Sequence, residues 1–270
     1  MDNSAYRRAY HEAETVLEQV LQAGDGSRLA DELWAVANAV DVNPVLRRNL
    51  GDPSREGADK AALAQRLLGG KVHDEALRVV GAVVSERWPE PGDIVSSLER
   101  LSVEAILAHA QRNGRLTQVE DELFRFGRIV EGTPDLQAAM SDRRADVRAR
   151  TTLVDRLLSV KAAPETVRLA KQAVASTRGR RFDHAIAAYL EQAAARQDQV
   201  TATVTSAVPL TPEQHDRLVR ALSTQYGRQV HTNVVIDEDV VGGMRVEIGD
   251  EVIDGTVSYR LAEAHRRMTS

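Results

Sequence analysis

The spacing of apolar residues divides the chain into two parts. Up to about residue 198, apolar side chains recur every three to four positions, which is the spacing of amphipathic helices. From Gln199 the pattern changes: Val200, Ala202 and Val204 alternate with threonines, as in a strand that buries one face. The sequence therefore predicts a mainly α protein with a small α+β domain at its C-terminal end.

The helical part contains an internal repeat. At an offset of 90, residues 14–90 align with residues 104–180 without a gap, and about eighteen positions are identical where chance gives about five. "LWAVANAVDVNPVLRRNLGD", from Leu33, aligns with "LFRFGRIVEGTPDLQAAMSD", from Leu123, so that Pro44 and Pro134 each begin a helix. Duplication explains this match. It predicts tandem N-terminal helical bundles, the first over residues 1–92 and the second over residues 93–198.

Each repeat is expected to hold about five short helices and a longer closing helix. The closing helices are Asp93–Arg112 and Phe182–Arg196, and Asp/Pro/Gly breaks separate the shorter ones. The first closing helix is also expected to open the second repeat.

Residues 199–270 predict a β-α-β-β-α domain. The strand "VTATVTSAVPL" leads to a helix that begins at Thr211 and Pro212, a cap followed by proline, and that ends at Gly227. Two more strands follow in "RQVHTNVVIDE" and "GMRVEIGD". A terminal helix is predicted in "TVSYRLAEAHRRM", where basic residues occupy the last turns.

Composition agrees with this fold and excludes several classes of function. The chain has 270 residues, 43% hydrophobic and only 4% aromatic, which favours helices packed through Ala, Leu and Val. Its net charge of −5 gives no general attraction to nucleic acid. It has no cysteine, which excludes thiolate metal sites, and no apolar window of bilayer-spanning length. Any contact with a membrane is therefore expected to go through partners.

The most patterned stretch is "VVGGMRVEIGDEVIDGTVSYRLAEA", which could hold a phosphate loop, a metal site or tight turns. Gly242 and Gly243 lie between two strand-like runs, and no helix start follows them to direct amides at a phosphate. Asp250 and Asp254 lie near glycines, as in ordinary turns, and Asp254 with Gly255 also suits a helix entry. We expect structural turns at these positions rather than a ligand site.

The sequence shows no pattern for catalysis, cofactor binding or metal binding. The seven histidines are scattered, and no HExxH, Gly-x-Ser-x-Gly or Gly-x-Gly-x-x-Gly motif occurs. We therefore expect no enzyme active site and no cofactor. Basic clusters in "TRGRRF", from Thr177 to Phe182, and around Arg47 and Arg48 leave one alternative, a helical regulatory protein that binds nucleic acid.

Two segments of the C-terminal part carry a family resemblance. "VTSAVPLTPEQHDRLVRAL" and "VVIDEDVVGGMRVEIGDEVIDGTVSYRLAEA" resemble, in order and spacing, the C-terminal signature of the delta subunit of the F-type ATP synthase. The mitochondrial counterpart is called the oligomycin-sensitivity-conferring protein. Residues 93–205 resemble the usual N-terminal six-helix bundle of the family and the lead into its first strand, and the extra copy, residues 1–92, resembles the long actinobacterial form.

The resemblance implies a non-catalytic stator subunit in the peripheral stalk. Such a subunit holds the N-terminal helices of the alpha subunits through a bundle and the b stalk through its C-terminal domain, so that torque from the rotor is resisted while ATP is made. It implies a place on the cytoplasmic side of the cell membrane, reached only through the complex.

The resemblance also implies a groove between the first and fifth helices of a bundle, where an alpha-subunit helix lies. In the second copy these helices are Asp93–Arg112 and roughly Pro164–Thr177. Their apolar residues are candidates to line the groove, although a small bundle must also bury such side chains in its core. The candidates are Leu98, Leu101, Ile106, Val167, Ala170 and Val174.

Overall fold

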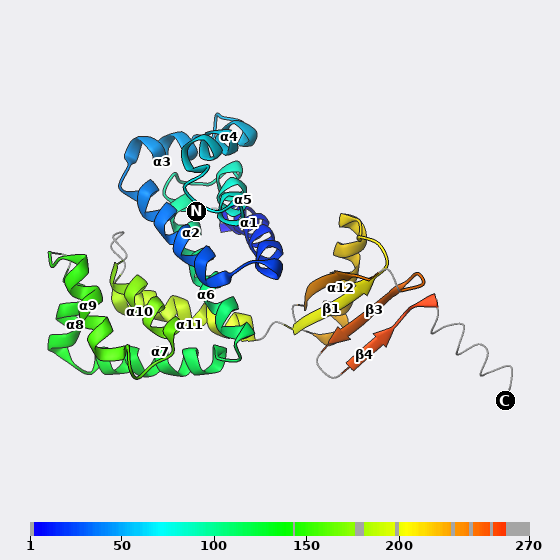
Figure 1. The fold of residues 1–270 in the computed structure, drawn as a ribbon. Coiled ribbons are helices and arrows are strands. Elements are labelled where there is room, and N and C mark those ends of the chain that lie inside the picture. Colours follow the sequence, from blue (N-terminus) through cyan, green and yellow to red (C-terminus); the bar gives the residue numbers. More distant parts are fainter. Residues whose placement is uncertain are drawn as a thin grey trace. The chain divides into compact units, whose positions relative to one another are not determined.

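The computed structural model describes residues 3–142, 144–175, 181–197, 200–227, 230–237, 240–248 and 251–257. The chain forms two compact units, Met1–Ala194 and Ala195–Ser270 (Figure 1). We call them the helical unit and the C-terminal unit. The predicted fold class, mainly α with a small α+β domain, is confirmed.

The helical unit is built from helices α1 to α11, whose bounds are as follows. They are α1 (Asn3–Ala23), α2 (Gly26–Asp41), α3 (Pro44–Leu50), α4 (Gly57–Leu68), α5 (Asp74–Ser85), α6 (Asp93–Arg112), α7 (Leu116–Glu131), α8 (Pro134–Ser141), α9 (Val147–Leu158), α10 (Pro164–Ala175) and α11 (Phe182–Gln197).

The helix bounds repeat with the offset of 90 residues that the sequence shows. Both ends of α7, α9 and α10 lie 90 positions after the ends of α2, α4 and α5. Pro44 and Pro134 each stand at the start of a helix, as predicted. We infer that the two repeats, residues 1–92 and 93–198, descend from one bundle.

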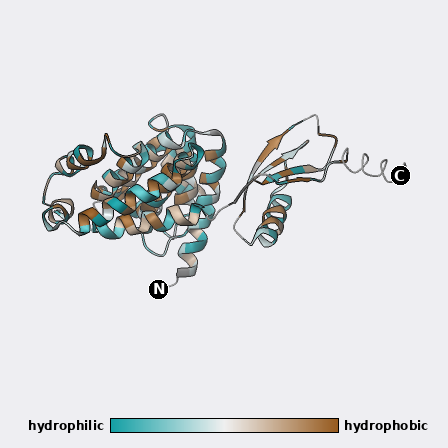
Figure 2. Ribbon diagram, turned by 90° about the horizontal axis from the view of Figure 1, so that it is seen from below, coloured by the Kyte–Doolittle hydropathy of each residue, from teal (hydrophilic) through white to brown (hydrophobic). Residues whose placement is uncertain are grey.

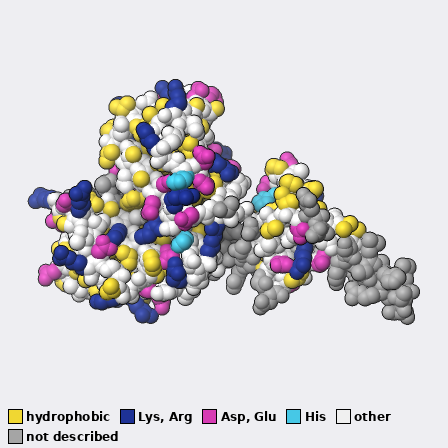
Figure 3. Space-filling view, in the orientation of Figure 1, with side chains coloured by type: hydrophobic (Ala, Val, Ile, Leu, Met, Phe, Trp, Pro, Cys, Tyr) yellow, Lys and Arg dark blue, Asp and Glu magenta, His cyan; other side chains and the backbone are white. Residues whose placement is uncertain are grey.

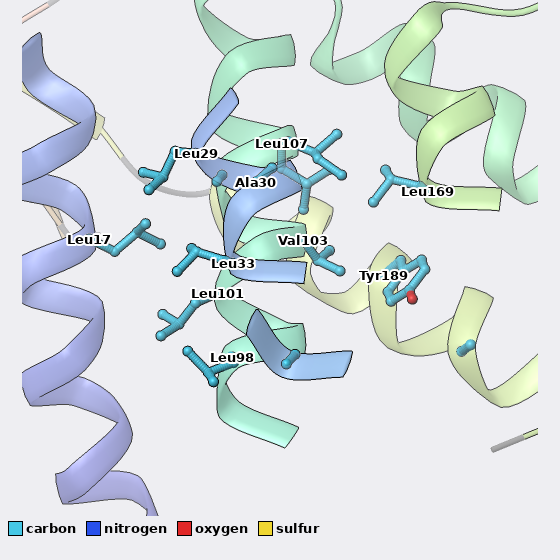
Figure 4. Close-up of a cluster of buried hydrophobic side chains, with 14 of the residues drawn as sticks. Leu17, Leu29, Ala30, Leu33, Leu98, Leu101, Val103, Leu107, Leu169 and Tyr189 are labelled. Carbon is cyan, nitrogen blue, oxygen red and sulfur yellow. The ribbon is translucent and has the colours of Figure 1, made fainter. Parts of the chain in front are cut away.

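One hydrophobic core runs through both repeats, and α6 lies in it (Figure 4). Fourteen of the twenty residues of α6 are buried, so this helix has no broad polar face. Leu101 of α6 lies near Leu33 of α2, and Val103 lies toward Tyr189 of α11. α6 therefore closes the first repeat and opens the second.

The remaining helices separate apolar from polar residues more clearly. In α7 the buried residues are Leu116, Val119, Leu123, Phe126 and Val130, which follow the helical period along one face. Figure 2 shows the same alternation of hydrophobic and hydrophilic faces around the helical unit. Burial of these faces against α6 and against one another explains why so many short helices are held in place.

The C-terminal unit is a four-stranded sheet with one helix. Its elements are β1 (Val200–Ser206), α12 (Pro212–Tyr226), β2 (Val230–Ile236), β3 (Met244–Ile248) and β4 (Glu251–Asp254). The strand order is β2-β1-β3-β4, and only the β1–β2 pair is parallel. α12 connects this parallel pair and packs against β2. The core between them contains Ala202, Val204, Leu222, Val230, Val246 and Ile248.

Helix α12 has the predicted ends. The Thr211 side chain accepts a hydrogen bond from the Gln214 backbone N–H, and the Gln214 side chain accepts one from the Thr211 backbone N–H. These reciprocal bonds form a capping box. Gly227 ends the helix with φ of 65°, a conformation that favours glycine.

Strand β4 was not predicted. It has four residues, two of them acidic, and it pairs only with β3 at the edge of the sheet. Such a short edge strand has too few residues to show a clear alternation of buried and exposed positions, and the sequence favoured a turn there. Asp250 and the predicted terminal helix beyond Val257 lie outside the described residues.

Candidate functional site

The predicted groove residues of the second repeat lie in the interior of the helical unit. In α6 these are Leu98, Leu101 and Ile106, and in α10 they are Val167, Ala170 and Val174. Five of the six are at most 1% exposed, and Val167 is 8% exposed. In this structure they pack against the chain itself and offer no open apolar surface.

Helix α2 of the first repeat covers this face. Gly26 and Ala30 lie on the α6 side of α2, and a Cβ at Gly26 would stand 3.0 Å from the Ala105 carbonyl oxygen. The Ser102 hydroxyl of α6 donates to the Ala30 carbonyl oxygen at 2.8 Å. Gln172 of α10 donates in turn to the Ser102 hydroxyl at 3.1 Å. Small side chains thus let α2 approach α6 closely.

Arg168 of α10 also contacts α2. Its guanidinium donates to the Ser27 carbonyl oxygen at 2.7 Å, to the Ser27 hydroxyl and to the Asp31 carboxylate. These contacts at the N-terminal end of α2 add to the packing of α2 on α6. The chain's own helix α2 therefore occupies the face that α6 and α10 would otherwise present.

The matching face of the first repeat is exposed at two polar positions, although Leu77, Val80 and Val84, the equivalents of Val167, Ala170 and Val174, are buried. By the offset of 90, Ser102 and Arg168 correspond to Glu12 of α1 and Arg78 of α5, and both of these are exposed. At Gly81 of α5, an added Cβ would meet no atom within 4 Å. Glu12 and Arg78 are thus exposed at positions whose equivalents in the second copy contact α2.

In both repeats, side chains from other helices hydrogen-bond to the backbone at the two ends of the fifth helix, which is α5 or α10. At the start, Glu32 of α2 accepts from the His73 backbone N–H, and Glu122 of α7 accepts from the Ala163 backbone N–H. His73 and Ala163 are equivalent positions just before α5 and α10. A carboxylate from the second helix of each repeat thus caps the fifth helix, which suits the positive end of its dipole.

At the C-terminal end of the fifth helix, a buried cation from the fourth helix donates a hydrogen bond to a backbone carbonyl oxygen in both repeats. The Lys60 ammonium of α4 donates to the Glu86 carbonyl oxygen at 2.7 Å, and the Arg150 guanidinium of α9 donates to the Val174 carbonyl oxygen at 2.6 Å. Lys60 and Arg150 are equivalent by the offset. Burial lowers the pKa of Lys60 from its usual value.

Glu165 of α10 is a buried carboxylate with two basic neighbours. Its side chain accepts hydrogen bonds from the Arg115 guanidinium, and a ring nitrogen of His109 lies 3.5 Å from one of its oxygens. Burial alone would raise the pKa of this carboxyl, but the Arg115 bond and the nearby charges bring it below its usual value. We assign this cluster to the joining of α6, α7 and α10.

The glycine-rich signature of the C-terminal unit forms a tight turn before β3. Gly242 and Gly243 have φ of 67° and 80°. A Cβ at Gly243 would stand 2.5 Å from the Gly255 carbonyl oxygen, so the backbone needs glycine there for space as well as for conformation. Gly255 has no positive φ, and its backbone N–H donates to the Met244 carbonyl oxygen.

Asp254 stabilises the turn that follows β4. Its carboxylate accepts from the Thr256 backbone N–H at 2.9 Å and from the Thr256 hydroxyl at 2.7 Å. These bonds lower the pKa of Asp254. Such a local arrangement is ordinary turn chemistry.

Neither metal-binding clusters nor membrane-spanning helices are found in the described parts of the chain. No group of three or more His, Asp or Glu residues there could hold a metal ion. No helix among these residues is long and apolar enough to cross a bilayer. Of the basic clusters, Arg47 is paired with Asp41, and most of Thr177–Phe182 lies outside the described residues.

Comparison with known proteins gives consistent results. The family model described as ATP synthase delta (OSCP) subunit matches residues 102–268. ATP synthase subunit delta of Kineococcus radiotolerans is 43% identical over 99% of this chain and 98% of its own length. The protein of the same name from Streptomyces griseus is 45% identical over 98% of this chain and 99% of its own length.

A chain in the cryo-EM structure of the Toxoplasma gondii mitochondrial ATP synthase hexamer is a more distant match. It is 16% identical, with 62% of this chain and 95% of that chain covered, and the TM-score is 0.29. The matches do not support a nucleic-acid-binding protein.

Proposed function

Because the chain belongs to the ATP synthase delta (OSCP) subunit family, we propose that its two units hold two different parts of the enzyme together. The chain is a non-catalytic peripheral-stalk subunit of the F-type ATP synthase. The helical unit holds the N-terminal helices of the alpha subunits, and the C-terminal unit holds the b stalk. The complex thereby keeps this subunit at the cytoplasmic side of the membrane.

The observation that carries this proposal is the division of a family member into two separately built units, each with its own core. A linker between a static stalk and a catalytic head needs two attachment sites that do not compete. Amphipathic helices are suited to bind a partner helix, and many modest contacts together give slow dissociation. No catalytic group is needed for this role.

Within the helical unit, the proposal favours the first repeat for the alpha-subunit helix. The groove expected between α6 and α10 of the second repeat is filled by α2, whose position Arg168 and Ser102 support. At the equivalent surface of α1 and α5, Glu12 and Arg78 are exposed. An alpha-subunit helix that binds there would meet exposed side chains of α1 and α5, such as Glu12 and Arg78.

Hydrogen exchange on the full chain tests this assignment. A synthetic peptide of the alpha-subunit N-terminus should slow amide exchange in the helical unit, with the largest effect in α1 and α5. A peptide taken from the C-terminal end of the b stalk should slow exchange only in the C-terminal unit. Protection of the C-terminal unit by the alpha peptide would contradict the proposal, and protection of α6 and α10 with release of α2 would move the site to the second repeat.

A further inference from the structure

Helix α9 of the second repeat carries a shallow groove on its exposed face. The groove has a volume of about 310 Å³, and it is lined by Arg148, Ala149, Thr152, Leu153 and Arg156. Leu153 is partly buried, and the other four residues are exposed. Figure 3 shows Lys and Arg side chains, in dark blue, at the edge of the helical unit where Figure 1 places α9. We call this surface the α9 groove.

The helical period places the two arginines at opposite ends of the α9 groove. Arg148, Thr152 and Arg156 are spaced four residues apart, so their side chains lie on one face of α9. A helix rises about 1.5 Å per residue, which separates the two arginines by about 12 Å along the axis, close to the diameter of one α-helix. The small residues Ala149 and Thr152 form the floor between them. A helix that crosses α9 therefore fits over Thr152 with one arginine on each side.

Neither arginine of the α9 groove uses its guanidinium group in a hydrogen bond or an ion pair with the described part of the chain. The nearby carboxylates are engaged elsewhere. The carboxylate of Asp146 accepts a hydrogen bond from the Arg148 backbone N–H at 3.0 Å, and that of Asp155 pairs with Lys171 at 2.6 Å. The groove thus presents two positive charges without a counter-charge, on a chain whose net charge is −5.

The equivalent helix of the first repeat has different charges. By the offset of 90, α4 has Ala58 and Asp59 where α9 has Arg148 and Ala149. An acidic residue in the first turn suits the positive end of the helix dipole, and α4 has one there. The first turn of α9 has no acidic residue and contains a cation, which is unfavourable at that end. The two copies therefore differ in a way that a binding partner explains and helix stability does not.

The size and charge of the α9 groove decide what kind of partner it fits. Its two arginines are too few for a membrane surface or a nucleic acid, which bind to larger clusters of Lys and Arg. The surface of a helix offers no free backbone groups to an extended segment. A partner helix satisfies its own backbone, and it can place small or apolar residues over Thr152 and acidic residues toward the two arginines.

Resting on the proposed function, we propose that the α9 groove binds an acidic amphipathic helix of another subunit in the ATP synthase complex. Asp or Glu residues on the two flanks of that helix pair with Arg148 and Arg156. Guanidinium–carboxylate pairs are directional, so they also fix the angle at which the helix crosses α9. This contact is additional to the surface of α1 and α5 and to the C-terminal unit, and it gives the second repeat an attachment of its own.

Photo-crosslinking in the assembled complex tests this proposal. The photoreactive amino acid p-benzoylphenylalanine replaces Thr152 in the full chain, and mass spectrometry of the purified complex identifies the crosslinked segment. The same replacement at Ala62, the exposed equivalent of Thr152 in the first repeat, is the control for position. We expect the probe at Thr152, and not the probe at Ala62, to crosslink to a helix of another subunit that has acidic residues on both flanks.

Charge reversal shows whether the arginines hold that helix. We expect the double variant Arg148→Glu with Arg156→Glu to lower the crosslinking yield at least about 10-fold. Arg148→Glu alone, which suits the helix dipole and so keeps α9 folded, should lower the yield in the same direction. Arg66→Glu, at the exposed equivalent of Arg156, should leave the yield unchanged.

The other results contradict the proposal in distinguishable ways. If the complex assembles and the probe at Thr152 gives no crosslink, or an equal yield after charge reversal, the α9 groove does not bind an acidic helix and the proposed function stands. Crosslinks only to lipid or to nucleic acid would show an occupant of another class and overturn the proposal. If the chain does not co-purify with the other subunits, the proposed function fails together with the α9 groove.

Discussion

The carboxylate of Glu165 joins α6, α7 and α10 through its contacts with His109 and Arg115. These contacts determine how the contribution of Glu165 to the stability of the fold depends on pH. A carboxyl whose pKa is lowered in the folded chain stabilises the fold fully above its usual pKa, and this stabilisation is lost as the pH falls through the folded value. We expect Glu165→Gln to be less stable than wild type near neutral pH, with the difference shrinking below the usual value of 4.5. Urea unfolding followed by tryptophan fluorescence measures this, because Trp34 and Trp88 both belong to the helical unit.

The chain supplies its own control for that measurement. Glu75 is the equivalent residue of the first repeat, but its side chain is 40% exposed and lies 3.8 Å from Arg28. Exposed ion pairs contribute little, so Glu75→Gln should have only a small effect at every pH. A stability difference for Glu165→Gln that does not change between neutral and acidic pH would contradict the account.

Gly243 is the residue of the signature turn that tolerates substitution least. Gly243→Ala would strain a backbone with φ of 80° and bring the new Cβ against the Gly255 carbonyl oxygen. We expect a loss of about 1–3 kcal/mol in the C-terminal unit. Gly227→Ala, where φ is also positive but a Cβ meets no atom within 4 Å, should cost less. Native-state hydrogen exchange of β1 amides reports on this unit, and equal losses in the two variants would show that the close approach is unimportant.

At the scale of helices, both repeats use side-chain hydrogen bonds to hold the ends of α5 and α10. Lys60→Ala and Arg150→Ala each remove a buried cation from the carbonyl end of a helix. We expect either change to lower the free energy of unfolding by about 1–3 kcal/mol. Arg66→Ala and Arg156→Ala are matched controls, because these residues are exposed on the same two helices and should stay within about 0.5 kcal/mol of wild type.

A result in which the buried and exposed substitutions cost the same would contradict this account of the helix ends. Urea unfolding monitored through Trp34 and Trp88 provides the comparison. A large effect of Lys60→Ala with none of Arg150→Ala would mean that the duplicated position has lost its function in the second repeat.

The helices were largely predictable from sequence, and their partners were not. Apolar period and proline at helix starts identify α6 and α12 nearly to the residue, and they identify the first residue of α3 and α8. The same period marks Leu98 and Ala170 as apolar but cannot tell whether a partner protein or α2 covers them. That depends on small residues such as Gly26 and Ser102, which permit close packing and have no periodic signal. β4 was missed because a short edge strand carries little pattern.

The sequence also could not predict which surface residues of the C-terminal unit lie at the same end of the sheet. The sequence indicates turns at Gly242 and Gly243, and the structure gives both a positive φ. It does not indicate that Val208 and Val257, nearly fifty positions apart, come to the same end of a sheet. Strand order determines that, and strand order is a long-range property.

At the scale of the whole molecule, we expect one chain to bind the head and the stalk at the same time through separate units. The most direct test is sedimentation velocity of the full chain with an alpha-subunit N-terminal peptide and a soluble fragment of the b stalk, each carrying a different dye. We expect one ternary species in which both dyes sediment with the chain, at affinities close to those of the separate binary complexes. Displacement of one partner by the other, with only binary complexes at saturation, would contradict it.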